Sequence, residues 1–369
     1  MTEYGWKEYR LGDIAELFDG PHATPKKTLS GPVFLGISSL NRGTIDESQF
    51  EYISESDYEL WTKRIAPKEH DIVFSYETKL GEAAIIPKGF RCCLGRRLGL
   101  LRVNDKLIDP HFLLYYYLSP IFQAVIHERT IHGTTVDRIP LLDMPKFPLI
   151  LPPLPEQRAI ASVLSSLDDK IDLLHRQNKT LESMAETLFR QWFIEEADEG
   201  WEDGKLDSIM ILSNGKARPN TEGLIPVYGG NGVLVYTDQF NYDGESIIIG
   251  RVGAYCGSLY FEENKIWVSD NALHAKARDP MENYYLFYLL KNLELNSFAE
   301  GSSHPLLTQT LLRSIDILLP LKEKRQKFSS VAKLIHSKII QNRKSIRTLE
   351  SLRDTLLPKL MSGEVRVQL

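Results

Sequence analysis

Residues 164–192, LSSLDDKIDLLHRQNKTLESMAETLFRQW, decide the fold of this chain, because their apolar residues recur at alternating steps of three and four. This spacing is the heptad pattern of a helix that buries one continuous seam against a partner helix. The predicted helix runs from about residue 156 to residue 193, well beyond the average length of a helix in a globular protein. Its seam consists of Leu164, Leu167, Ile171, Leu174, Asn178, Leu181, Ala185, Leu188 and Trp192.

A second seam occupies residues 335–360, IHSKIIQNRKSIRTLESLRDTLLPKL, within a helix predicted from about residue 322 to residue 361. One asparagine interrupts each seam, Asn178 in the first and Asn342 in the second. Seams of this length are typical of two helices that form a coiled coil. The members of the second seam are Ile335, Ile339, Asn342, Ile346, Leu349, Arg353, Leu356 and Leu360.

The second seam lies in a repeat of the first. Residues 133–193 align with residues 301–361 at a constant offset of 168 without a gap. The stretches that precede the copies also begin alike, with Gly5-Trp6 and Gly200-Trp201. Such self-similarity indicates a duplicated architecture that does one thing twice. We therefore expect an α+β fold with two mixed α/β domains, separated by a long intramolecular antiparallel two-helix coiled coil with a pseudo-twofold repeat.

The two asparagines predict how the helices pair. In an antiparallel pair, facing residue numbers add up to a constant, and a total of 520 brings Asn178 beside Asn342. The two amides then satisfy each other, whereas a buried unpaired amide costs about 1–3 kcal/mol. A parallel pair would place each Asn opposite an apolar residue, and in a further alternative each Asn points to solvent near a frayed edge. The same register pairs Ile171 with Leu349, Leu174 with Ile346, Leu181 with Ile339 and Ala185 with Ile335.

The globular parts carry the same order of elements twice. The first predicts strands at residues 33–37, 71–75 and 98–103, then a helix that opens at Asp109-Pro110 and continues through Phe122. The second predicts strands at residues 246–249 and 266–268, then a helix over residues 284–293. The predicted segments are two globular domains, 1–154 and 197–320, and two helical segments, 155–196 and 321–369.

The composition is that of a globular protein with a mild acidic excess. The 369 residues include 44 basic and 49 acidic side chains, a net charge of −5 that argues weakly against a broad nucleic-acid-binding surface. Three cysteines provide neither a disulfide framework nor metal-ligand spacing. The polar first ten residues do not resemble a secretory signal, and the longest apolar stretch is too short to span a bilayer. We expect a cytoplasmic protein.

Charge is unevenly distributed between the two helices. Residues 156–193 carry five basic and six acidic side chains, whereas residues 322–359 carry eleven basic and three acidic ones. One interpretation is a solvated face that complements the first helix. The other is a contact with DNA phosphate or with a partner subunit.

Polar side chains on the predicted turns are candidates for contact with DNA. Arginine, lysine and asparagine are suited to this because they reach base edges or phosphates with directed hydrogen bonds. A residue of this kind, taken alone, is more often an ordinary surface residue, and we expect about half of the set to contact DNA. The candidates are Lys26, Lys27, Tyr76, Lys79, Arg96 and Arg97 in the first domain, and Lys216, Arg218, Asn231, Arg251, Tyr255, Asn271 and His274 in the second.

No motif indicates catalysis by the chain. Residues 229–232, Gly-Gly-Asn-Gly, lack the Lys-Ser/Thr ending of a phosphate-binding loop and predict a tight hairpin turn instead. Asp243 with Glu263-Asn264-Lys265 resembles a nuclease carboxylate set only loosely, and no serine-hydrolase order, zinc-protease motif or dinucleotide fingerprint occurs. We predict a binding protein rather than an enzyme, with no metal site.

With these features the chain resembles the specificity subunits of type I restriction-modification enzymes over essentially its whole length. The most specific phrase is Leu-Pro-Pro-Leu-Pro-Glu-Gln-Arg at residues 151–158, which precedes the first long helix. Further phrases are Trp6 with Leu11-Gly12-Asp13-Ile14, residues 229–232, residues 247–253 and residues 349–363. The second copy departs from the Pro-rich phrase and reads Leu-Pro-Leu-Lys-Glu-Lys-Arg at residues 319–325, which puts identical partner contacts by the two copies in doubt.

The resemblance implies a non-catalytic subunit whose globular parts are target-recognition domains. Each would read one half of a split double-stranded DNA target, and the helices would form the spacer and dock two methyltransferase subunits. It implies that S-adenosylmethionine binds to the methyltransferase, that this chain binds no cofactor, and that restriction subunits are further possible partners. An alternative is a coiled-coil scaffold that binds only proteins. A third is a nuclease or methyltransferase that acts alone.

Overall fold

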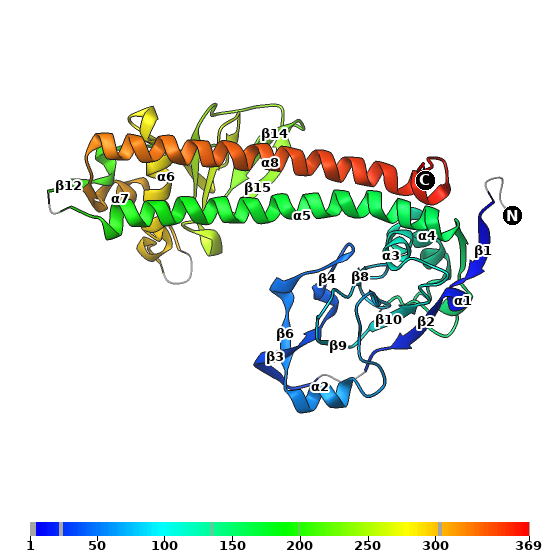
Figure 1. The fold of residues 1–369 in the computed structure, drawn as a ribbon. Helices are drawn as coiled ribbons and strands as arrows, with labels where there is room; N and C mark the ends of the chain where they lie inside the picture. The colour runs from blue at the N-terminus through cyan, green and yellow to red at the C-terminus, as the bar shows by residue number, and fades with distance from the viewer. Residues whose placement is uncertain (1–4, 22–24, 134–135, 199, 302–304, 369) are drawn as a thin grey trace. The chain divides into compact units, whose positions relative to one another are not determined.

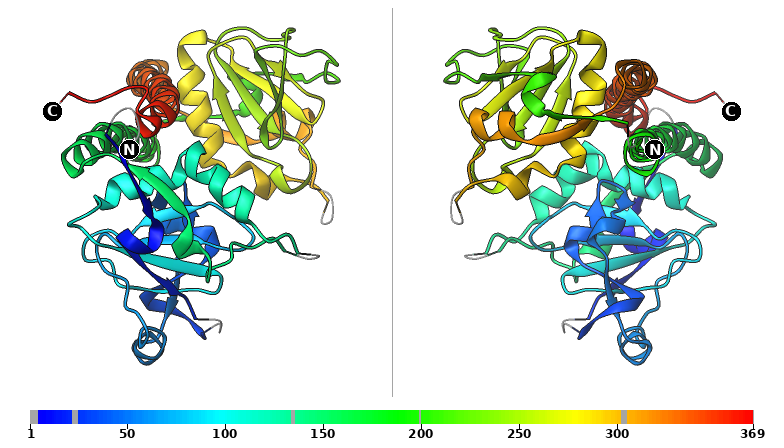
Figure 2. Two further views of the ribbon diagram at one scale, coloured as in Figure 1. Left: turned by 90° about the vertical axis from the view of Figure 1, so that its right-hand side faces the viewer. Right: turned by 90° about the vertical axis from the view of Figure 1, so that its left-hand side faces the viewer.

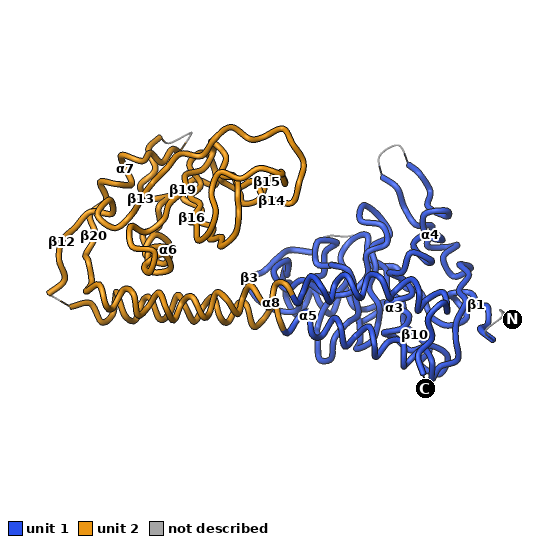
Figure 3. The backbone as a smooth tube through the Cα atoms, turned by 90° about the horizontal axis from the view of Figure 1, so that it is seen from above, with its two compact units in different colours: residues 1–173, 345–369 blue, residues 174–344 orange. Residues whose placement is uncertain are grey.

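The structure is a computed structural model that describes residues 5–21, 25–133, 136–198, 200–301 and 305–368. It divides into two compact units (Figure 3): unit 1 comprises residues 1–173 and 345–369, and unit 2 comprises residues 174–344. Helices α5 (Leu154–Arg190) and α8 (Lys322–Ser362) both belong partly to each unit. The division predicted from the sequence is different, with two globular domains and two separate helical segments. The boundaries of those four segments remain a prediction.

Unit 1 is built around a four-stranded antiparallel sheet with the strand order β2-β10-β7-β8. Helix α3 (Pro110–Leu118) covers this sheet and lies between it and α5, so its apolar residues are buried on both sides (Figure 1). Three smaller sheets complete the unit, with the orders β6-β3-β9, β1-β11 and β4-β5. The strands are β1 (Lys7–Arg10), β2 (Ala15–Asp19), β3 (Lys27–Leu35), β4 (Leu40–Asn41), β5 (Thr44–Ile45), β6 (Glu51–Ile53), β7 (Ile72–Ser75), β8 (Ala83–Ile85), β9 (Cys92–Leu94), β10 (Leu98–Val103) and β11 (Pro148–Leu151).

The helix predicted from Asp109-Pro110 through Phe122 is in fact two helices. Helix α3 ends at Leu118, and α4 (Pro120–Arg129) begins directly afterwards. Pro120 lacks the backbone N–H that a continuing helix needs, and it favours an extended conformation at the residue before it. Ser119 has such a conformation and caps α4 by accepting a hydrogen bond from the backbone N–H of Phe122. The short helices α1 (Leu11–Ile14) and α2 (Glu55–Trp61) complete the unit.

Unit 2 repeats the design of unit 1. Its four-stranded sheet has the order β13-β19-β16-β17, and helix α6 (Asn283–Asn292) lies between this sheet and the long helices (Figure 2). A parallel strand pair, β14 with β18, corresponds to β3 with β9 in unit 1. The duplicated α+β fold predicted from the sequence is confirmed. The remaining elements are β12 (Glu202–Lys205), β13 (Met210–Asn214), β14 (Ile225–Gly229), β15 (Gly232–Thr237), β16 (Ser246–Gly250), β17 (Leu259–Glu262), β18 (Trp267–Val268), β19 (Ala272–Ala277), β20 (Asp316–Leu319) and α7 (Gln309–Ser314).

The paired helices run antiparallel within each unit. In unit 2, Nδ2 of Asn342 donates to Oδ1 of Asn178 at 2.9 Å, so the hydrogen bond predicted by the heptad register is present. These side chains are only 2% and 8% exposed, respectively, so neither points to solvent. In unit 1, the Arg353 guanidinium binds the Asp168 carboxylate at 2.8 Å, which shows how an arginine is accommodated at a seam position.

The observed helices closely match the predicted ones. Helix α5 starts at Leu154, two residues before the predicted start, and a wider helical turn over Gln191–Glu195 follows its end. Helix α8 covers Lys322–Ser362. Among the described residues, none of the helices combines the length and apolar character that crossing a bilayer requires. The three cysteines are buried and unpaired, and burial raises their pKa values.

Candidate nucleic-acid interface

The hairpin turn at the tip of β14 and β15 is the first part of the interface in unit 2. Gly229 pairs with Gly232 across the strands, so Gly230 and Asn231 form the two-residue turn that the sequence predicts. Gly232 has a φ of +80°, which favours glycine because a side chain would clash there. Asn231 is exposed at the tip.

The ends of β16 and β19 provide the second part. The ladder between these strands ends with Gly250 opposite Ala272, and the next residues continue it, because the N–H of Arg251 donates to the carbonyl of Asn271 at 3.1 Å. We call Arg251 and Asn271 the ladder-end pair of unit 2. The carbonyl of Arg251 accepts a further hydrogen bond from the N–H of Leu307 at 2.9 Å, so its backbone is held on both sides.

A short 3-10 helix, Gly253–Tyr255, joins these two parts. Ser258 donates to the carbonyls of both Gly230 and Tyr255, which ties the hairpin turn to this loop. A Cβ atom on Gly230 would lie 3.7 Å from both the Asn271 carbonyl oxygen and Cβ of Tyr255. The structure therefore brings four candidates together at one end of the sheet, and we call Asn231, Arg251, Tyr255 and Asn271 the Arg251 edge.

The Arg251 edge presents polar groups that the chain itself does not use. Within the described part of the chain, the side chains of Asn231, Arg251 and Asn271 have no hydrogen-bond partner or ion pair. Nε of Arg251 is buried without an acceptor, although the residue as a whole is partly exposed. Tyr255 is 52% exposed. Free bidentate donors on rigid strand ends are suited to an external ligand with paired acceptors.

The two basic candidates Lys216 and Arg218 lie on the loop after β13 in unit 2. The N–H of Lys216 donates to the carbonyl of Val268, close to the connection that leads to Asn271. Lys216 and Arg218 are both exposed, and their side chains have no partner among the described residues. They add positive charge near the Arg251 edge, but they lie on a loop and not at the end of a strand ladder.

The prediction that His274 lies on a turn is wrong. His274 belongs to β19, a central strand, and is 3% exposed. Its ring stacks on Tyr242 with centroids 3.6 Å apart, and Nε2 lies 3.1 Å from Oγ of Ser246. Burial, with a smaller contribution from Lys276, lowers its pKa from 6.5 to about 4. His274 is therefore a neutral core residue that cannot reach DNA from this position.

Unit 1 has a ladder-end pair at the equivalent position. The β7–β10 ladder ends with Ser75 opposite Leu98, and the N–H of Tyr76 then donates to the carbonyl of Arg97 at 3.2 Å. Tyr76 is buried, and burial together with Asp19 raises the pKa of its hydroxyl. Nη1 of Arg97 donates to Thr78 at 3.1 Å, and its Nε lies 3.1 Å from the Glu77 carboxylate. The side chains of both Tyr76 and Arg97 therefore already interact with other residues of unit 1.

The remaining candidates of unit 1 fall into two groups. Lys79 follows Tyr76 on the same loop and Arg96 precedes Arg97, and both side chains are exposed beside the ladder-end pair. Lys26 and Lys27 lie at the start of β3 in a different sheet. Lys27 forms an ion pair with Glu51 on β6, which occupies its charge.

A further backbone pairing that the sequence did not suggest lies beside each ladder-end pair. In unit 1, Arg138 bridges both Ile131 and Glu77, and the N–H of Ile139 donates to the carbonyl of Tyr76. In unit 2, Leu306 bridges both Glu300 and Val252 in the same way. Exposed Arg138 therefore lies beside Glu77, the residue that follows Tyr76. The repeat alignment, which begins at Gly133 and Gly301, was the signal that could have identified it.

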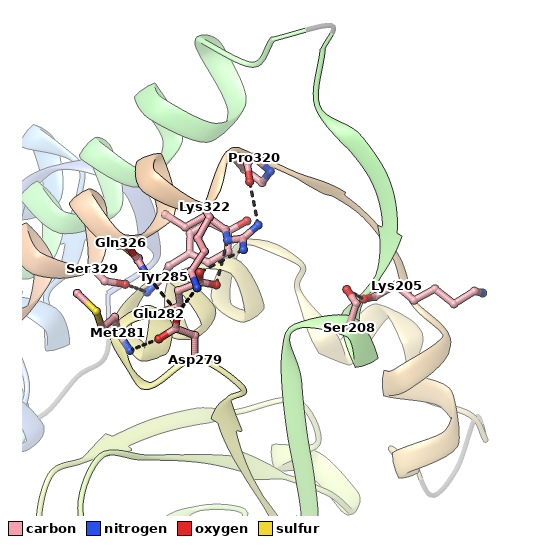
Figure 4. Close-up of polar contacts among 11 residues, drawn as sticks. Lys205, Ser208, Asp279, Met281, Glu282, Tyr285, Pro320, Lys322, Gln326 and Ser329 are labelled. Carbon is pink, nitrogen blue, oxygen red and sulfur yellow. Dashed lines mark hydrogen bonds and ion pairs between the residues drawn. The ribbon is translucent and has the colours of Figure 1, made fainter.

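The start of each long helix is fastened to its unit by equivalent residues. In unit 2, Arg325 donates to the Pro320 carbonyl at 2.8 Å and forms two hydrogen bonds with the Glu282 carboxylate at 2.9 and 3.1 Å (Figure 4). In unit 1, Gln157 takes the place of Arg325 in the repeat alignment and donates to the Pro152 carbonyl at 2.9 Å. The departure of the second copy from the Pro-rich phrase therefore changes the side chain but keeps the contact.

One of the two carboxylates that loosely resemble a nuclease set has a structural partner. Glu263 accepts a hydrogen bond from the hydroxyl of Tyr284 on α6. Among the described residues there is no group of three or more His, Cys, Asp or Glu that could hold a metal ion.

Comparison with known proteins decides the family. The family described as "Type I restriction modification DNA specificity domain" matches residues 3–183 and 198–351, which together are most of the chain. The chain belongs to this family. The two matched ranges correspond to the two copies, and the family description indicates recognition of a DNA target as the common task.

Relatives of known name are specificity subunits. The chain is 25% identical to the specificity subunit of the type I restriction enzyme MjaIX of Methanocaldococcus jannaschii, over 98% of this chain and 94% of the relative. It is 27% identical to the putative MjaX specificity subunit of the same organism, with the same coverage of both chains. The crystal structure of a type I S subunit from M. genitalium has a TM-score of 0.66 at 20% identity, covering 98% of this chain and 97% of that one. This similarity shows the fold.

Proposed function

We propose that this chain is the subunit that reads a split DNA target, with one half-site read by each unit. The observation that carries the proposal is the duplicated ladder-end pair, Tyr76 with Arg97 and Arg251 with Asn271, since each pair ends the central sheet of its unit. A further backbone pairing and exposed basic residues lie beside each pair. Basic residues beside polar groups on rigid strand ends fit a division into phosphate contacts that position and base contacts that specify.

In the proposed complex, the chain does not catalyse a reaction. It docks two methyltransferase subunits, and restriction subunits where the system includes them. The duplication supports two copies of one partner, since equivalent surfaces occur once in each copy. S-adenosylmethionine would be bound by the methyltransferase, which would flip the target adenine out of the duplex to methylate it.

The long helices would set the distance between the half-sites. A helix of 37 residues, the length of α5, spans about 56 Å at a rise of about 1.5 Å per residue. This corresponds to roughly 16 base pairs of DNA at about 3.4 Å each. Domains centred somewhat inside the helix ends would read half-sites about one turn of DNA apart. The unread gap in the target would therefore be a mechanical property of the helix pair.

The test is to express the full chain with its methyltransferase subunits in a host without other adenine methylation, and to sequence the methylated adenines. The expected result is one motif with two short specified halves and an unspecified gap of fixed length. Methylation without a motif, or a complex that assembles but has no sequence preference, would refute the proposal and favour the protein-only scaffold. Methylation by the purified chain alone would favour an enzyme.

A further inference from the structure

The Arg251 edge carries an inference about which bases unit 2 reads, and this inference rests on the proposed function. We infer that the ladder-end pair of unit 2 reads two purines at neighbouring base pairs of the major groove, with Arg251 on a guanine and Asn271 on an adenine. The half-site of unit 2 would thus contain a guanine and an adenine that lie next to each other, on one strand or across strands.

The first step is that three other arginines of unit 2 already have partners within the chain. Nε of Arg278 donates to the carbonyl of Asp207 at 2.8 Å, Arg313 binds Gln309, and Arg325 binds Glu282. Arg251 differs, because Nε is buried without an acceptor among the described residues while the residue remains partly exposed. No residue of the described part of the chain accepts a hydrogen bond from the Arg251 guanidinium, so its exposed nitrogens are left for a bound ligand.

The asparagines show the same contrast. Asn241 exchanges two hydrogen bonds with Val268, at 2.8 and 2.9 Å, and Asn283 bonds Glu245 and the N–H of Ala277. Asn271 is exposed, and in the described part of the chain its amide has no partner. Its amide therefore keeps both a donor and an acceptor free, which is the pair of groups that matches N7 and N6 of adenine.

The backbone fixes the spacing of the two side chains. Arg251 and Asn271 are directly opposite each other at the end of an antiparallel ladder, where facing residues are about 4.5–5.5 Å apart and point to the same face of the sheet. The rise of DNA is about 3.4 Å per base pair, so side chains at this spacing reach the same or the next base pair. In the major groove, Arg pairs with guanine and Asn pairs with adenine.

The loop that follows Arg251 packs closely against the end of the sheet. Gly250 precedes Arg251, and a Cβ atom there would lie 2.2 Å from the carbonyl oxygen of Tyr255 and 2.5 Å from Oγ of Ser258. Only glycine allows the loop to fold back so closely beside the ladder end. Exposed Lys216 and Arg218 lie on the loop after β13 and would contact phosphates, which adds affinity but no sequence preference.

Unit 1 provides the internal comparison. Its ladder-end pair is Tyr76 and Arg97, and the Arg97 guanidinium is held by Thr78 and Glu77. The same backbone position therefore presents a different chemistry in each unit. Substitutions at the Arg251 edge should change one half of the target and leave the other half unchanged.

The experiment uses the full chain assembled with its methyltransferase subunits, with motifs read from methylated adenines and affinities measured on duplex oligonucleotides of the wild-type motif. The test variants are Arg251→Lys, which keeps the charge but loses the planar fork, and Asn271→Asp, which keeps the size but loses the amide donors. The matched controls are Arg278→Ala, whose side chain is occupied by Asp207, and exposed Asn264→Ala on the turn after β17.

The expected result is that Arg251→Lys relaxes a guanine position and Asn271→Asp relaxes an adenine position next to it, both in the same half of the motif. Each test variant should weaken binding to the wild-type oligonucleotide by about 5- to 150-fold, whereas the controls keep the motif. The other half of the motif, still read in each variant, shows that the protein remains folded.

Three outcomes would overturn the inference while leaving the proposed function intact. They are a bipartite motif without adjacent guanine and adenine in either half, a motif unchanged in both test variants, and relaxed positions that fall in different halves. A wild-type complex without any motif would refute the proposed function itself, so the two failures are distinguishable.

Discussion

The buried Asn178–Asn342 pair allows a quantitative test of the helix register. The perturbation is Asn→Leu at either position alone and at both. Each single variant leaves one amide without the 2.9 Å hydrogen bond in a seam where the two residues are 8% and 2% exposed. An unsatisfied buried amide costs about 1–3 kcal/mol, so each single variant should lose about that much free energy of unfolding.

The double variant should be close to the wild type in stability, because replacing both partners by apolar groups removes the penalty along with the bond. The two substitutions should therefore couple by about 2–6 kcal/mol in a double-mutant cycle, which is the sum of the two single losses. The free energies would be measured by urea unfolding of the full chain, followed by helix circular dichroism. The matched controls are Gln177→Leu and Gln341→Leu, since each changes an exposed amide one residue before its Asn on the same helix.

The reasoning predicts that both controls change stability by less than about 0.5 kcal/mol. Additive losses in the double variant would mean that the amides do not satisfy each other, and neutral single variants would mean that neither is buried. Either result would refute the register in which facing residue numbers add up to 520.

Three further predictions concern spacing, the C-terminal tail and acid stability. One heptad inserted at facing positions of both helices adds about 10.5 Å of helix, so it should lengthen the unread gap of the methylated motif by about three base pairs. Both halves of the motif should stay unchanged, and altered halves would contradict the prediction. Arg366→Ala should lower the free energy of unfolding by about 1–3 kcal/mol, because it leaves the buried Glu156 carboxylate without its bonds at 2.7 and 2.8 Å. Lys359→Ala, which removes a partly exposed ion pair with Glu364, should cost less than about 1 kcal/mol. The folded-state pKa of His274, about 4, lies below its ordinary value of 6.5, so the unfolded chain binds this proton more readily. The contribution of His274 to the free energy of unfolding should therefore be fully present above pH 6.5 and be lost as the pH drops toward 4. The free energy of unfolding should fall less over this range in His274→Gln than in the wild type. Equal pH profiles of the two proteins in urea unfolding would contradict the assignment.

The long helices could be predicted from the sequence because their signal is local and periodic. Alternating steps of three and four over many turns specify a helix face directly, and the observed bounds of α5 and α8 differ from the predicted ones by only a few residues. The register followed from one chemical rule, since two buried amides in facing seams are most stable when they meet. Pro120 was also visible in the sequence, and its break between α3 and α4 follows from the geometry of proline.

The central strand β19 could not be predicted in the same way. Residues 272–277, Ala-Leu-His-Ala-Lys-Ala, lie between β13 and β16 and are buried on both faces over most of their length, so no alternation of apolar and polar residues marks them. His274 was for this reason assigned to a turn. Its partner Tyr242 and the hydroxyl of Ser246 are distant in sequence, and their contacts arise only from the packing of the sheet.

The ladder-end pairs explain why the duplication is visible in the helices but not at the recognition surface. The helices align at a constant offset of 168, whereas Tyr76 and Arg251 are 175 residues apart and Arg97 and Asn271 are 174 apart, so loops of different length hide their equivalence. Only the backbone register reveals it, because each pair continues a ladder of the same sheet. Helix packing limits change along the seam, while the side chains at a strand end are free to differ once the backbone bonds are made. The two copies of the fold can therefore keep the same helix packing, which would bind their partners, and still differ in the bases that they read.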